Sequence, residues 1–351
     1  MKSKEPTSTF IEIPASNPPR PIKYCLFYKE GEKIKEQLVN KSSDFNYSSM
    51  VIKTVANSSG PLPFMFEEYR DHYDSLPQVV REIMKSAIKK IRWQMASRDN
   101  PSVFFDTRFV EPGNVAHLMI CLIPLILTIK KEVGANVDFI FYKLGDHFLK
   151  LLNYFDIQPK LSAKRCRGER VILFARRDFK LVPYDLYAMD QYFLKFFPEI
   201  YKNCKIKKTL TAPKVFMARK NKRAFINENE IDLFLSKYGF QKFYLEDLTI
   251  EDQISLAAHA EYVVATSGAA LSYLVLNPSL KGVVEVSTPN FFEEFLAEVL
   301  SCKTDRYITI LPELDWNKVM IPWEYRVREK DSNFKLDMIF LEKAMEALDL
   351  K

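Results

Sequence analysis

The sequence predicts an α/β protein with two domains, each built on a parallel sheet. Its 351 residues are more than one compact core usually holds, so two domains are the first expectation. Strand-like apolar runs alternate with helical segments, which is typical of βαβ units with helices on both faces of a sheet. A polar, lysine-rich stretch at residues 198–212 interrupts this alternation, which restarts after Pro213. We therefore expect one domain on either side of this linker.

The first half of the chain contains the elements of one domain, after a polar, proline-rich extended leader at residues 1–22. Apolar residues spaced three and four apart predict an amphipathic helix at residues 77–97. Short β-branched and aromatic runs then alternate with apolar helical stretches. In chain order we expect strand 24–28, helix 77–97, strand 102–105, helix 115–131, strand 137–142, helix 147–155, strand 170–175 and helix 185–196. These elements define an N-terminal domain at residues 23–200.

The second half repeats the alternation and ends in a long amphipathic helix. Gly239 is expected to end one helix, and Thr249 is expected to cap the start of the next. In chain order we expect strand 214–218, helix 229–238, strand 241–245, helix 249–260, strand 262–265, helix 269–276, strand 282–286 and helix 331–350. Residues 213–330 form the predicted C-terminal domain, and the terminal helix at 331–351 is expected to pack back on the first domain.

Composition and charge exclude several classes of protein. With 47% hydrophobic and 27% charged residues, the chain has the composition of a folded globular protein. Its formal net charge of +6 suits an anionic ligand or membrane surface, and falls short of a nucleic-acid binder. The most apolar run, residues 118–129, is too short to span a bilayer. We expect a cytoplasmic protein, with membrane contact limited to the inner face through the basic side of the helix at 77–97.

Cysteine usage and missing motifs narrow the chemistry further. Five cysteines without a C-x-x-C pair or a Cys/His cluster argue against structural zinc and indicate a reducing compartment. The P-loop, G-x-G-x-x-G, G-x-S-x-G and H-E-x-x-H motifs are absent, which disfavours the enzyme classes that depend on them. The D-x-D motif, which holds a metal on the diphosphate in many nucleotide-sugar enzymes, is absent as well. A diphosphate bound here must be neutralised by Lys, Arg and backbone amides, without a metal.

An anion site is predicted where two strands of the C-terminal domain end. Arg219 ends the first strand of this domain, and Arg223 follows in a polar loop. Ligands bind at the carboxyl edge of open α/β sheets, and two planar guanidinium groups suit a diphosphate. The turn formed by Ser267, Gly268 and Ala269 leads from a later strand into a helix. Its small residues and the helix N-terminus allow an anion to approach the backbone.

Carboxylates also follow predicted strands where they can serve chemistry. Glu285 lies in the apolar strand at 282–286, where an unpartnered carboxylate is costly to bury. At the strand's end it can accept hydrogen bonds from a ribose diol. Asp106 and Asp146 come just after predicted strands of the first domain and are candidate general bases.

The C-terminal stretch resembles the glycosyltransferase 61 family, also called the DUF563 domain. The motifs that carry the resemblance share the family's order and spacing: Arg219 and Arg223, Asn227-Glu228, Gly239-Phe240, Asp252-Gln253-Ile254, Ser267-Gly268-Ala269-Ala270-Leu271 and Val283-Val284-Glu285. Upstream, Gly113 to His117 (GNVAH) resembles the family's N-x-(G/A)-H element. The chain departs from the family at Ser267, because the family usually has His before this Gly.

The resemblance implies a GT-B fold, with two Rossmann-like domains facing a central cleft and the donor bound mainly by the C-terminal one. It implies inverting, metal-independent transfer of a sugar from a nucleotide-sugar, with a UDP-sugar as our first expectation, and no cofactor. The acceptor would be a hydroxyl of a glycan or lipid-linked saccharide in polysaccharide or glycoconjugate assembly. Arg219, Arg223 and the amides of Gly268 and Ala269 would then stabilise the leaving diphosphate. Glu285 would hold the ribose.

The resemblance also makes His117 the first choice of general base, because a His can take the acceptor's proton near neutral pH. Two alternatives remain at this point. The change at Ser267 is compatible with a catalytically degenerate protein that binds a nucleotide-sugar or glycan, and such a protein would not hydrolyse the donor. A nucleotide-sugar epimerase on a similar fold would instead form product without any acceptor.

Overall fold

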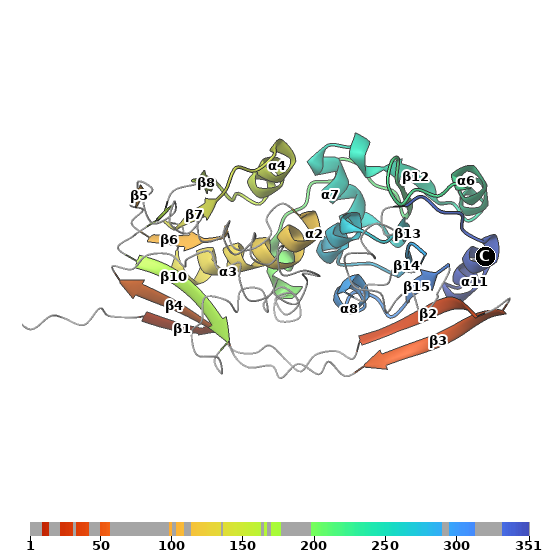
Figure 1. The fold of residues 1–351 in the computed structure, drawn as a ribbon, viewed down its shortest axis with the longest axis horizontal. Helices are drawn as coiled ribbons and strands as arrows, with labels where there is room; N and C mark the ends of the chain where they lie inside the picture. Colours follow the sequence, from red (N-terminus) through yellow and green to blue (C-terminus); the bar gives the residue numbers. More distant parts are fainter. Residues whose placement is uncertain are drawn as a thin grey trace, which may run out of the picture. The chain divides into compact units, whose positions relative to one another are not determined.

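Two sheets organise the computed structural model, one in each of two units (Figure 1). Unit 1 comprises Met1–Asn17 and Asn46–Phe196, and unit 2 comprises Pro18–Phe45 and Phe197–Lys351. The structure describes residues 9–13, 22–30, 33–41, 50–56, 98–99, 103–108, 114–134, 136–162, 165–166, 170–176, 198–289, 295–312 and 332–350. The expected helices at 77–97, with its basic side, and 185–196 lie outside the described residues. The α/β class predicted from the sequence is confirmed.

Unit 1 contains a six-stranded sheet in the order β1-β4-β10-β6-β7-β8. The last four strands of this order are parallel, whereas β4 is antiparallel to both β10 and β1. The strand bounds are β1 Thr9–Ile13, β4 Met50–Ala56, β10 Arg170–Arg176, β6 Val103–Asp106, β7 Asp138–Phe141 and β8 Pro159–Leu161. The expectation of an extended leader is wrong at β1, because these residues pair along their whole length with β4.

A continuous helical segment follows β6 in unit 1. It consists of α2 (Val115–His117), a π-helical turn η2 (Leu118–Leu122) and α3 (Ile123–Val133). The Asn114 side chain caps its start by accepting a hydrogen bond from the Ala116 amide, at 2.9 Å. Every residue of η2 is buried, as expected of a helix that is apolar all round. The shorter elements of this unit are α4 Asp146–Tyr154, β5 Arg98–Asp99 and β9 Arg165–Cys166.

Unit 2 contains a seven-stranded sheet in the order β12-β11-β13-β14-β15-β2-β3. Strands β12 to β2 of this order are parallel, and β3 is antiparallel to β2. The bounds are β12 Gln241–Tyr244, β11 Lys214–Ala218, β13 Tyr262–Thr266, β14 Gly282–Val286, β15 Tyr307–Leu311, β2 Ile22–Glu30 and β3 Lys33–Lys41.

The position of β2 and β3 corrects the expected domain boundary. We expected residues 23–200 to form one domain, but residues 18–45 belong to unit 2 with the C-terminal half. The physical reason lies in β2, where Tyr24, Leu26 and Phe27 are buried. Side chains of successive residues point to opposite faces of a strand, so β2 is apolar on both faces. Such a strand suits an interior position beside β15, with the polar β3 outside it.

The helices that the structure describes in unit 2 are η4 Pro198–Asn203, α6 Glu228–Ser236, η5 Leu245–Asp247, α7 Ile250–His259, η6 Ala269–Leu276, α8 Phe295–Leu300 and α11 Met338–Ala347. Four of them, α6, α7, η6 and α11, overlap the expected helices, and η4, η5 and α8 were not expected. Gly239, at φ +83°, lies just beyond α6, and Thr249 caps α7 by accepting a hydrogen bond from the Asp252 amide. Of the helices within the described residues, none is both long and apolar enough to cross a membrane.

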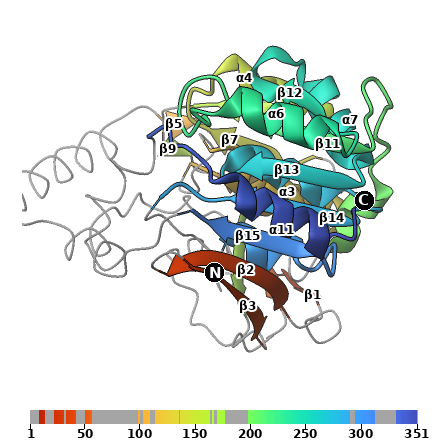
Figure 2. The same ribbon diagram turned by 90° about the vertical axis from the view of Figure 1, so that its right-hand side faces the viewer.

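The C-terminal helix α11 packs within unit 2. Its residues Phe340, Leu341 and Ala344 are buried in one apolar cluster with Phe216 of β11 and Val264 of β13. Figure 2 shows α11 lying against the central strands of this sheet. The prediction that this helix packs back on the first domain is therefore wrong. The amphipathic pattern predicted the helix correctly, but its apolar side covers the sheet of its own unit.

Candidate functional site

The basic loop after β11 brings two arginines to one turn of unit 2. Ala218, the last residue of β11, is buried, and the chain emerges at Arg219. Arg223 adopts a left-handed backbone conformation at φ +58°, which is uncommon for a residue other than glycine. Its Nη1 donates a hydrogen bond to the main-chain oxygen of Ser267 at 3.1 Å. The loop after β11 is thus tied to the turn that follows β13.

Gly268 is the point on which both guanidinium groups converge. A Cβ atom built on Gly268 would lie 2.7 Å from Nη1 of Arg219 and 3.4 Å from Nη1 of Arg223. Glycine is the residue that leaves this space to the arginines. The predicted residues Arg219, Arg223, Ser267 and Gly268 therefore come together in the structure, although 44 residues separate Arg223 from Ser267 in sequence.

The electrostatics of this turn suit an anion. Ala269 begins the helix η6, so the N-terminal end of that helix lies beside the two guanidinium groups. Helix N-termini carry partial positive charge and amide donors. Ala269 is partly exposed, so an incoming group can reach this end of the helix. Two arginines and a helix N-terminus form a surface that can bind a phosphate or diphosphate.

An anchor that the sequence analysis missed holds the other side of the basic loop. Lys220 forms an ion pair with Asp247 at 2.6 Å, and its Nζ lies 5.2 Å from the ring centroid of Tyr244. The Tyr244 hydroxyl in turn hydrogen-bonds to Glu228. These contacts fix the loop against β12 and the start of α6. The lysine was visible in the sequence, but its partners belong to other elements and could not be read from spacing.

Glu285 lies inside unit 2, on the face of the sheet opposite to α11. It is 1% exposed, and its Oε2 accepts a hydrogen bond from the Tyr307 hydroxyl at 2.7 Å. Burial, and then the charge of Glu285, raise the pKa of Tyr307 well above its ordinary value, so the tyrosine stays protonated and donates. This arrangement favours a structural role for Glu285. Its contact with a ribose stays a prediction that the burial does not support.

Buried hydroxyl groups surround the same ends of the strands. Thr266 ends β13, Thr288 follows β14, and Thr309 lies in β15 beside Glu285. Their Oγ1 atoms are buried and have no hydrogen-bond partner among the described residues. Most buried polar groups in proteins do have such a partner. These three threonine hydroxyl groups are therefore able to form further hydrogen bonds.

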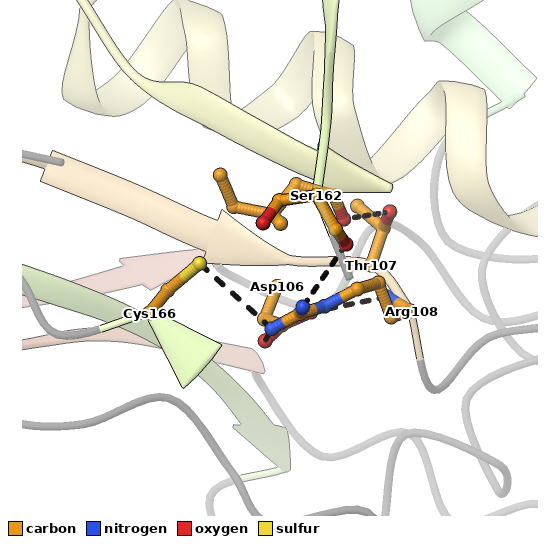
Figure 3. A network of polar contacts seen from close by, with 6 residues as sticks. Asp106, Thr107, Arg108, Ser162 and Cys166 are labelled. Atoms are coloured by element: carbon orange, nitrogen blue, oxygen red, sulfur yellow. Dashed lines mark hydrogen bonds and ion pairs between the residues drawn. The ribbon is translucent and has the colours of Figure 1, made fainter. Parts of the chain in front are cut away.

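In unit 1, the carboxylate of the predicted base Asp106 forms a buried ion pair with Arg108 (Figure 3). Arg108 donates from Nε to Oδ1 of Asp106 at 2.8 Å and from Nη2 to Oδ2 at 2.6 Å. It also donates from Nη1 to the main-chain oxygen of Ser162 at 3.1 Å, and its Nη2 contacts Cys166 Sγ at 3.8 Å. Burial lowers the pKa of Arg108, but the hydrogen bond and charge of Asp106 outweigh this effect and raise it. The pair favours a structural role for Asp106, and its role as base stays a prediction.

His117 lies at the junction between α2 and the π-helical turn η2. It is partly buried, whereas the residues that follow it in η2 are fully buried. Isolated π-helical turns within helices occur frequently at functional sites. His117 and Asp106 belong to unit 1, and the predicted donor residues Arg219, Arg223 and Glu285 belong to unit 2.

The model of a family described as Glycosyltransferase 61 matches residues 115–284. The match begins at the first residue of α2 and ends within β14, so it includes His117 and the turn at Gly268. A search among curated proteins gives no match. Among the described residues, no group of three His, Cys, Asp or Glu side chains is arranged to hold a metal ion.

Proposed function

The chain belongs to the glycosyltransferase 61 family and is a glycosyltransferase, and we propose that it transfers a sugar from a nucleotide-sugar to a hydroxyl of a glycan acceptor. The observation that carries this proposal is the convergence of Arg219 and Arg223 on the turn at Gly268. A UDP-sugar is the donor that we expect first. The acceptor is a glycan or a lipid-linked saccharide, and the reaction takes place in the cytoplasm.

The proposed role of the arginine site is to stabilise the leaving nucleoside diphosphate. As the bond between the anomeric carbon and the diphosphate oxygen breaks, negative charge develops on that oxygen. Arg219, Arg223 and the amides at Gly268 and Ala269 are placed to bind such a group. Donors fixed in advance around developing charge are among the largest contributions to catalysis. Because this site supplies the positive charge itself, we propose that transfer does not require a metal.

Ser267 does not remove this site, although the family usually has His at its position. The group that Arg223 binds is the main-chain oxygen of Ser267, which every residue type provides. The Ser267 side chain is 7% exposed and small enough to leave room at the turn. The contact between the basic loop and the turn therefore survives the change of side chain, so the proposed donor site does not depend on the family's His. Hydrolysis of the donor by the purified protein distinguishes an active transferase from a degenerate protein that only binds.

In the proposed reaction, an acceptor hydroxyl attacks the anomeric carbon on the side opposite to the diphosphate, with inversion. His117 takes the proton from that hydroxyl as the new bond forms, and the diphosphate leaves with the electrons of the broken bond. Supporting this choice, His117 is partly exposed and within the matched family range. We further propose that the two units are the two Rossmann-like domains of a GT-B enzyme.

A thermal-shift screen against UDP, GDP, CMP and their sugars, with and without EDTA, tests the proposal. A ligand that binds the native state raises the melting temperature by mass action. We expect one nucleotide to do so with and without EDTA, and to lose its effect in Arg219→Ala. The matched control is Arg306→Ala, which removes an arginine of unit 2 that is paired with Asp349. No shift with any nucleotide, or an equal shift in Arg219→Ala, would contradict the proposal.

A further inference from the structure

Tyr142 is an exposed aromatic residue at the carboxyl edge of the sheet of unit 1. The three residues before it, Phe139 to Phe141, are buried in β7, and the chain leaves the core at Tyr142. The tyrosine exposes 38% of its surface. Ligands of open α/β sheets bind at this edge of the strands. The mechanism proposed above gives Tyr142 no role.

A buried cation holds the Tyr142 ring in place. The Arg108 guanidinium carbon lies over the ring, 5.4 Å from its centroid. The Arg108 side chain is itself 0% exposed and is fixed by Asp106 and by the main-chain oxygen of Ser162. Cations over aromatic faces attract the ring electrostatically, more strongly when the cation is desolvated. One face of the ring is therefore directed at a fixed interior group, and the exposed surface belongs to the rest of the ring.

The loop that begins at Tyr142 also offers polar groups. Lys143 and Asp146 are exposed, and Asp146 begins α4. No side chain caps the start of that helix at Gly145. Burial raises the pKa of Tyr142, and the charge of Arg108 lowers it less, so its hydroxyl stays protonated and can donate. A rigid aromatic face with hydrogen-bonding groups nearby suits a ligand that has both an apolar face and many hydroxyls.

We propose that Tyr142 is a saccharide-binding residue, and that the C–H face of an acceptor sugar ring stacks on its exposed face. Arg108 is its positioning residue, because it reaches the sugar only through the ring. The identification of this sugar as the acceptor rests on the proposed function, since the acceptor side of such an enzyme is the unit that does not hold the donor. The binding of a sugar to Tyr142 does not depend on the transferase reaction.

The test is direct sugar binding by the full chain, measured by saturation-transfer NMR. The probes are the methyl α- and β-glycosides of glucose, galactose, mannose and N-acetylglucosamine. Three variants are compared with the unaltered protein: Tyr142→Ala, Tyr142→Phe, which keeps the ring, and Tyr238→Ala. The last is a matched control, because Tyr238 is a partly buried tyrosine of unit 2 that packs against Phe234.

We expect the unaltered protein, Tyr142→Phe and Tyr238→Ala to bind at least one glycoside with similar affinity. Tyr142→Ala should bind it about tenfold more weakly, which is a loss of about 1.4 kcal/mol of binding free energy. The rise in melting temperature that a bound nucleotide causes should be the same in this variant as in the unaltered protein. Equal binding by Tyr142→Ala, or no binding of any glycoside by the unaltered protein, would overturn the proposal. If sugar binding depends on Tyr142 but no nucleotide binds, the proposed transfer reaction fails while the saccharide site stands.

Discussion

Replacing Gly268 by alanine tests whether the arginine site works as the structure implies. The new Cβ would lie 2.7 Å from Nη1 of Arg219, whereas an ordinary contact begins at 3.4 Å. The guanidinium group must therefore move by about 0.7 Å, the difference between these two distances. Arg219 is a long side chain and can yield. Because Gly268 has a φ of +159°, which L residues rarely adopt, the substitution also strains the backbone and should lower the melting temperature. The fold should persist while the anion site loses its geometry.

The expected effect follows from the strength of charged hydrogen bonds. Such a bond contributes about 1.5–3 kcal/mol, and a misplaced donor loses part of that. We expect Gly268→Ala to weaken nucleotide binding about tenfold, which corresponds to about 1.4 kcal/mol. The assay is isothermal titration with the nucleotide that most stabilises the unaltered protein. Far-ultraviolet circular dichroism and the melting temperature establish that the variant is folded.

Two controls separate displacement of Arg219 from a general loss of stability. Gly239→Ala strains the backbone, because Gly239 has a φ of +83°, but the nearest atom to its new Cβ is 4.0 Å away in Lys214. It should melt earlier and bind nucleotide normally. In an Arg219→Ala background, Gly268→Ala should have little further effect, since the group that it displaces is gone. Unchanged affinity in Gly268→Ala, or additive effects in the double variant, would refute the reasoning.

Three further substitutions test the buried groups and the proposed base. Tyr307→Phe removes the hydroxyl that donates a hydrogen bond to the buried Glu285, so it should cost about 1–3 kcal/mol of unfolding free energy in urea. Because the folded-state pKa of Tyr307 lies above its unfolded value of 10.0, its contribution is complete below about pH 10 and falls as the pH rises further; this alkaline loss should shrink in the variant. His117→Ala should lower turnover about 100-fold or more with nucleotide affinity and stability retained. Asp106→Asn should instead cost about 3–5 kcal/mol of stability, because it removes the carboxylate charge that neutralises the buried Arg108 guanidinium. Normal turnover in His117→Ala, or a fully stable Asp106→Asn with lost turnover, would reverse the two assignments.

The arginine site could be predicted because the physics behind it is local. In parallel sheets the strand ends lie at one edge, so residues that follow β11 and β13 must come close whatever else the fold does. Arg219, Arg223 and Gly268 meet for this reason. The sequence could not show that the glycine makes room for the protein's own arginines, because that depends on side-chain conformation.

The burial of Glu285 and its hydrogen-bond partner could not be predicted in this way. Its place in a short apolar strand suggested a carboxylate at the sheet edge, yet all five residues of β14 are buried. The partner that makes this tolerable is Tyr307, 22 residues away on β15. Asp106 differs, because its partner Arg108 is only two residues further on and was open to inspection in the sequence. Proximity in sequence alone did not reveal that the pair would be buried.

The two corrections to the fold have a common cause. The apolar run of β2 and the apolar stripe of α11 show that each element must be covered, but they do not show which part of the chain covers it. Pairing between β2 and β15 joins residues that are 283 positions apart in sequence (Cys25 and Ile308), and no local pattern encodes it. Domain boundaries drawn from chain order are therefore least secure for elements near the ends.

The placement of β2 also determines how this protein can be divided and how it is made. The chain begins in unit 1, contributes β2 and β3 to unit 2, returns to complete unit 1, and only then supplies the rest of unit 2. A fragment that starts at residue 197 would lack these two strands and would expose the backbone edge of β15. Unpaired strand edges promote aggregation, because they can pair with another chain. During synthesis β2 can pair at once with β3, but its other neighbour, β15, emerges 283 residues later (Cys25 pairs with Ile308). Unit 2 is thus the last to be completed, and it cannot be expressed or exchanged as a simple C-terminal half.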